Sequence, residues 1–154
     1  MATKLAPSLR QAGQDWLLSC ADDPASIRQA WDAENLAPFL TGLRWRAAEA
    51  PLVQSMDAIR RIGSDRLGPV LADVTSERAW WLLPPGFGNE LDDVRLLKVQ
   101  PRGWTLRCPP VLYAVRGRVW VEGPDGSGRL TDPVLLGAAL GPGGGPRLPA
   151  EAFG

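Results

Sequence analysis

Acidic side chains are the first candidates for chemistry, because this chain of 154 residues contains no histidine and only two cysteines. Histidine is the commonest general acid or base near neutral pH and the commonest metal ligand in proteins. Nucleophilic catalysis needs a serine, cysteine or threonine beside a base, and the usual base, histidine, is absent from this chain. Metal-assisted phosphoryl transfer needs only carboxylates that converge on cations, so it is the enzymatic chemistry that remains open.

Three groups of acids could supply such carboxylates, namely Asp22 with Asp23, Asp32 with Glu34, and the set of Glu90, Asp92 and Asp93. The first pair is explained as a helix cap, and the second lies at a helix end with its carboxylates on different faces. The third would present Glu90 and Asp92 on one side if the chain is extended there. We favour solvated loop acids, and a nucleotidyl-transfer enzyme that uses the third group is an alternative.

Arginines and aromatic residues form a more informative pattern. Six basic residues and no acid lie between Val94 and Val121, interleaved with Trp104, Tyr113 and Trp120. Such a mixture on one sheet face is able to follow phosphates and stack bases, and it is also typical of protein interfaces. Because the formal net charge is zero, we favour a protein partner, with single-stranded nucleic acid as the alternative. The residues predicted to make this contact are Arg95, Lys98, Arg102, Trp104, Arg107, Arg118 and Trp120.

The helices that must position these residues follow from hydrophobic spacing. Leu9 to Cys20 has a helical period, and Asp23–Pro24 begins a second helix that stops before Pro38. We expect the two helices to form a hairpin that packs on the rest of the chain, with Trp16 and Trp31 as core anchors. A brief helix is expected over 57–62 and a last one, capped by Asp132, over 133–140.

Strands are expected where apolar residues alternate or form short runs. The segments with this pattern are 41–47, 52–56, 70–72, 80–83, 94–99, 104–108 and 118–121. The third and fourth segments flank a polar tip, which predicts a hairpin. The order of elements indicates an α+β domain with a mostly antiparallel mixed sheet.

Composition bounds the rest of the prediction. We expect a single domain over residues 1–140 and a flexible tail rich in glycine and proline over 141–154. Cys20 and Cys108 are expected as free thiols, because buried cysteine behaves as a small hydrophobic residue. No cofactor is expected. The chain has neither a signal-peptide pattern nor a run of about 18 apolar residues, so we predict no membrane contact and a cytoplasmic location.

A family resemblance adds to this interpretation. The stretch LGPVLA (67–72), followed by RAWWLLPPG (78–86), resembles part of the N-terminal domain of actinobacterial bifunctional DNA primase/polymerases, the prim-pol domain. Further segments follow in the family's order over 25–140, namely Val94–Leu97, Gly103–Trp104, Pro109–Pro110, Gly117–Trp120 and Leu135–Ala138. The resemblance implies a prim-pol-like scaffold.

The catalytic residues of that family are not matched. Its members use an acidic pair on a core strand, a further acid and a histidine, and the matching strand here is expected at 52–56, which has no carboxylate. Asp57 follows that segment singly, and the helix over 5–20 replaces the family's opening strand and nucleotide loop. The resemblance therefore implies a degenerate scaffold. We predict a non-catalytic regulatory or adaptor protein that binds a protein partner.

Overall fold

Two helices open the described part of the chain, which is residues 7–141 of the computed structural model. They are α1 (Pro7–Ser19) and α2 (Pro24–Asp32). The start of α2 is as the sequence predicts, because the carboxylate of Asp23 accepts a hydrogen bond from the backbone N–H of Ser26. Trp31 is buried and donates from Nε1 to the carbonyl of Cys108 at 3.0 Å, whereas Trp16 is only half-buried. Trp31 is thus the main anchor of the helical pair.

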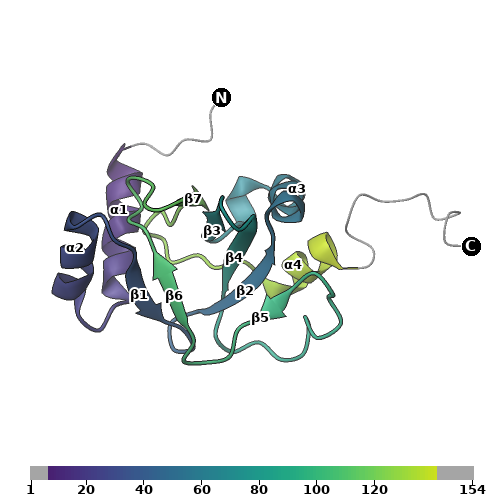
Figure 1. The fold of residues 1–154 in the computed structure, drawn as a ribbon. Helices are drawn as coiled ribbons and strands as arrows, with labels where there is room; N and C mark the ends of the chain where they lie inside the picture. Colours follow the sequence, from purple (N-terminus) through teal and green to yellow (C-terminus); the bar gives the residue numbers. More distant parts are fainter. Residues whose placement is uncertain (1–6, 142–154) are drawn as a thin grey trace, which may run out of the picture.

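A two-stranded ribbon lies beside these helices, as Figure 1 shows. Its strands are β1 (Ala37–Leu40) and β6 (Thr105–Cys108), and they pair antiparallel. Phe39 and Leu106 are opposite each other and point into the core, whereas Pro38 and Leu40 are exposed. The ribbon therefore has one buried face and one outer face.

A five-stranded sheet forms the centre of the fold (Figure 1). Its order is β5 (Lys98–Val99), β2 (Arg46–Pro51), β4 (Arg78–Leu83), β3 (Val70–Asp73) and β7 (Arg118–Glu122). All of its described pairings are antiparallel. The hairpin of β3 and β4 confirms the sequence prediction, and the helices and antiparallel sheet together confirm the α+β class.

Both faces of this sheet are buried, which explains the unbroken apolar run at the end of β4. Trp80 and Leu82 face the ribbon and the N-terminal helices. Trp81 and Leu83 face the opposite layer, which contains α3 (Leu52–Ile62) and α4 (Pro133–Leu140), with the short 3-10 helix η1 (Ser64–Arg66) following α3. In that layer Trp81 Nε1 donates to Ser55 Oγ at 3.0 Å.

The strand predicted at 52–56 is wrong, because this segment is the first half of α3. Leu52, Ser55, Ile59 and Ile62 repeat every three or four residues and turn toward the sheet, and this spacing extends across both halves of α3. A run of five residues is too short to distinguish helix from strand by its own period. The assignment of the family's acidic strand to this segment fails with it.

Two other predicted strands are largely turns. The chain between Thr41 and Trp45 reverses direction at Gly42, whose φ is +114°, and Gly42 N–H donates to the carbonyl of Trp45 at 2.9 Å. This turn leaves Leu43 exposed, so β2 begins only at Arg46. Of the strand predicted at 94–99, only Lys98 and Val99 pair with a neighbour. The tail predicted for 141–154 lies outside the described residues except for Gly141.

Candidate functional site

A row of charged residues crosses the five-stranded sheet on the face that carries Trp80. The row, here called the charged row, consists of Lys98, Glu49, Arg78, Asp73 and Arg118, in order from β5 to β7. Residues paired across antiparallel strands point to the same face, and so do residues two apart on one strand. The register therefore brings together charges from all five strands.

Each carboxylate of the charged row is held by an arginine. Arg78 Nε lies 2.9 Å from Glu49 Oε2, and Arg118 Nε lies 3.0 Å from Asp73 Oδ2. The other oxygen of Glu49 accepts from Gln100 Nε2 at 3.1 Å. Arg118 also donates from Nη1 to the carbonyl of Arg107 at 2.6 Å, which connects the sheet to the ribbon. The row is therefore a set of partly buried ion pairs.

The environment of Asp73 favours its charged form. Burial raises the pKa of Asp73. Hydrogen bonds from Ser76 and Arg118, together with the charge of Arg118, lower this pKa by more than burial raises it. The net pKa is below the ordinary value of an aspartate, so this carboxylate is ionised throughout the neutral range.

The two carboxylates of the row do not converge. Glu49 is on β2 and Asp73 on β3, with β4 between them, so two strand spacings of about 4.8 Å each separate their backbones. Within residues 7–141, no group of three or more acids or cysteines is arranged to hold a metal ion. The charged row therefore forms ion pairs within the protein, and its two carboxylates do not make a shared acidic site.

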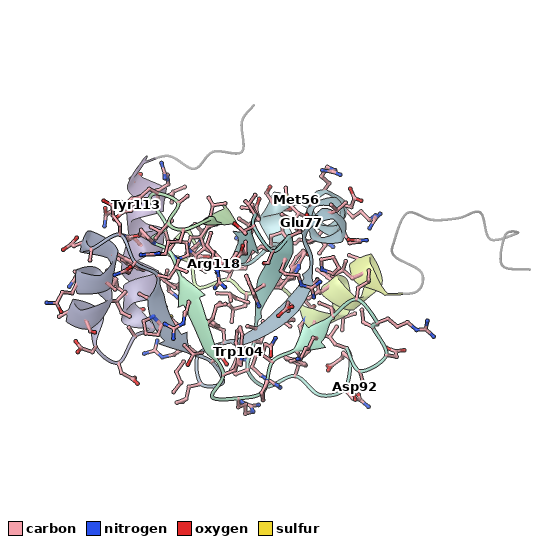
Figure 2. The ribbon with its side chains drawn as sticks, viewed as in Figure 1. Met56, Glu77, Asp92, Trp104, Tyr113 and Arg118 are labelled. Atoms are coloured by element: carbon pink, nitrogen blue, oxygen red, sulfur yellow. The ribbon has the colours of Figure 1, made fainter. Side chains whose placement is uncertain are left out.

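The seven residues predicted to form a contact face are dispersed. Lys98 and Arg118 lie at opposite edges of the five-stranded sheet, and Figure 2 shows Trp104 at the far end of β6 from Arg118. Arg95 and Arg107 are exposed, on the loop before β5 and on the ribbon. Their side chains do not form one continuous basic face.

Three of the seven are engaged within the protein. Trp120 is buried and donates from Nε1 to the carbonyl of Pro109 at 3.0 Å. Arg102 donates to the carbonyls of Gly42 and Pro85, at 2.7 and 2.6 Å, and so joins the turn after β1 to the loop that follows β4. Arg118 belongs to the charged row, and Trp104 is half-buried.

The acids predicted as an enzymatic alternative lie elsewhere. Glu90, Asp92 and Asp93 are exposed in a series of turns between β4 and β5, and the backbone N–H of Asp92 donates to the carbonyl of Asn89. This segment is therefore not extended, which was the condition for presenting two of them on one side. Figure 2 places Asp92 at the periphery of the molecule, away from Arg118.

A groove that the sequence analysis missed lies beside β1. It encloses about 690 Å³ between the α1–α2 connection and β1 with its following turn, and is here called the β1 groove. Leu40 and Leu43, which border it, are 62% and 81% exposed, and Arg44 beside them is also exposed. The sequence feature that could have indicated this groove is the pair Leu40 and Leu43 on either side of Gly42.

A second hollow of about 620 Å³ lies at the end of β7. Arg10, Arg129, Glu122 and Asp125 border it, so its charges are mixed. Burial raises the pKa of Glu122, while Arg10 Nη2 donates to the carbonyl of Leu112 at 2.5 Å. These features do not select one class of ligand.

Comparison with known proteins adds no family to this description. No protein-family profile matches the chain, and neither the curated proteins nor the solved structures contain a match. The resemblance to the prim-pol domain therefore stays a prediction. None of the helices formed by residues 7–141 has the length and hydropathy needed to cross a bilayer.

Proposed function

We propose that this chain is a non-catalytic adaptor or regulatory protein that docks a protein partner at the β1 groove. The observation that carries the proposal is the exposure of Leu40 and Leu43 at the rim of a groove of about 690 Å³. Adjacent exposed leucines beside a hollow are typical of protein interaction sites, because docking removes their apolar surface from water.

The charged row supports the non-catalytic part of the proposal. Glu49 and Asp73 already accept hydrogen bonds from arginines, so their oxygens are committed to pairing within the sheet. We retain the degenerate prim-pol-like scaffold and the cytoplasmic location as parts of the same proposal. The site of contact moves from the residues predicted between 94 and 121 to the neighbourhood of β1, where Arg102 and Arg107 of that set remain.

Site-specific photo-crosslinking in the source cell tests the proposal. A photoreactive phenylalanine analogue at Leu43 should yield a crosslinked protein, which is then identified, purified and titrated against the full chain by calorimetry. Leu40→Asp and Leu43→Asp should each weaken this binding by at least about tenfold, because a buried leucine contributes roughly 1.5–3 kcal/mol.

Val53→Asp is the matched control, because Val53 is 65% exposed but lies on α3, across the sheet from the β1 groove. It should leave the affinity unchanged. The proposal is wrong if Leu43 crosslinks to nothing that binds the purified chain, or if Val53→Asp weakens binding as much as Leu43→Asp.

A further inference from the structure

The outer edge of β1 is open to another strand. The backbone N–H of Thr41 donates to the carbonyl of Trp104 at 2.9 Å, and the carbonyl of Thr41 accepts from Gly103 at 2.7 Å, so the backbone of Thr41 faces β6. The backbone N–H and C=O groups of successive residues point to opposite sides of a strand. The carbonyls of Pro38 and Leu40 and the N–H of Leu40 therefore point away from β6. Proline has no N–H and is tolerated at such an edge. Among the described strands, β1 pairs with β6 alone.

The β1 groove runs along this edge. Its far wall is the α1–α2 connection and the first turn of α2, and its floor includes Ile27 and Phe39. A strand laid beside β1 would turn alternate side chains toward this apolar floor. The intervening side chains would lie on the outer face, beside Leu40 and Leu43.

The outer face of the ribbon carries arginines without carboxylate partners. Arg107 is opposite Pro38 on the ribbon, and Arg44 and Arg102 lie beside the exposed leucines. The ion pairs found within residues 7–141 join Arg60 with Asp57, Arg78 with Glu49 and Arg118 with Asp73. Arg102 is occupied by the carbonyls of Gly42 and Pro85, so Arg44 and Arg107 are the arginines that remain available to carboxylates of a partner.

We propose that the occupant of the β1 groove is an extended peptide segment of the partner that alternates apolar and acidic residues and adds to β1 as a third strand. The proposal rests on the proposed function and specifies the chemistry of its partner. The backbone N–H and carbonyl of Leu40 provide the main-chain hydrogen bonds. Apolar side chains cover Ile27 and Phe39, while glutamates cover the leucines with their methylene groups and pair with Arg44 and Arg107.

A peptide fits this groove better than a nucleic acid does. Asp22 and Asp23 line the wall opposite β1 and would repel the evenly spaced charges of a phosphate backbone. A strand places all of its acids on one side and keeps them away from that wall. The exposed large apolar side chains here are leucines, and these offer no aromatic plane for base stacking.

Defined peptides and the full chain, labelled with nitrogen-15, test the inference. The probes are seven-residue peptides that alternate valine with glutamate, with lysine or with serine, together with a twelve-nucleotide oligothymidylate. The glutamate peptide should bind at least about tenfold more tightly than the lysine peptide by fluorescence anisotropy. Its binding should also slow hydrogen exchange of the Leu40 amide, which is the direct sign of strand addition.

Charge reversal provides the matched comparison. Arg44→Glu should weaken binding of the glutamate peptide by about tenfold or more, whereas Arg66→Glu, an exposed arginine on η1, should not. Equal binding of the lysine peptide, preference for the oligonucleotide, or unchanged exchange at Leu40 would each overturn the inference. A partner crosslinked at Leu43 together with any of these results would leave the proposed function standing while the inference falls.

Discussion

The guanidinium of Arg118 lies over the indole ring of Trp80, with Cζ 4.5 Å from the ring centroid. The same guanidinium pairs with Asp73 and donates to the carbonyl of Arg107. One side chain at the edge of the sheet thus combines a cation–π contact, an ion pair and a bond to the ribbon. The charged row is for this reason part of what holds the ribbon against the sheet.

Arg118→Ala is expected to destabilise the protein by about 1–3 kcal/mol, because it removes these contacts and leaves the partly buried carboxylate of Asp73 without its cation. Urea unfolding followed by tryptophan fluorescence measures the loss. Arg66→Ala is the control, because Arg66 is exposed, and it should change the free energy of unfolding by less than about 0.5 kcal/mol. Equal losses in the two variants would show that Arg118 has no special role.

The stability of the protein should depend on the ionisation of Asp73. Its folded pKa is lowered, so the ionised carboxylate contributes stability that is fully present above the unfolded pKa of about 3.9. That contribution is lost as the pH falls through the folded pKa. Asp73→Asn should reduce the free energy of unfolding at pH 7 and show a shallower decline below pH 4 than the natural chain. Parallel pH curves would contradict this prediction.

Gly13→Ala is expected to destabilise the contact between α1 and the segment after β7. A β-carbon at Gly13 would lie 1.8 Å from the carbonyl oxygen of Pro124, so the two backbones must separate. We expect this separation to cost about 3 kcal/mol and the helix propensity of alanine to return roughly 1 kcal/mol, for a net loss of about 2 kcal/mol. Gly86→Ala is the control, since nothing lies within 4 Å of its β-carbon position. Thermal unfolding measures both variants.

The two free cysteines should differ in reactivity. Burial raises the pKa of Cys108, and burial also raises the pKa of Cys20, where the nearby indole of Trp45 and the charge of Arg44 act in the opposite direction. Because the thiolate is the reactive form, iodoacetamide at pH 8 should modify the half-buried Cys20 slowly and Cys108 only after unfolding. Mass spectrometry over time in buffer and in urea measures this order. Modification of Cys108 at the same rate in both solutions would contradict it.

Local signals determined several elements from the sequence alone. Asp23 and Pro24 begin α2, the polar tip after Ala72 closes the hairpin of β3 and β4, and Asp132 caps α4 through the backbone N–H of Val134. In each case the residues that set the boundary are neighbours in the chain. Caps and tight turns therefore predict these elements without knowledge of the rest.

Only the tertiary structure decided where the candidate sites lie. The segment at 52–56 is helical because its packing against the sheet follows the helical spacing of three to four residues. Leu43 is exposed because the chain turns at Gly42. The charged row draws on five strands, and the β1 groove draws on three separate segments of the chain, within 20–27, 38–44 and 102–105. Strand order and register depend on long-range pairing, so the periodicity of a single strand leaves the neighbours of Glu49 or Leu40 undetermined.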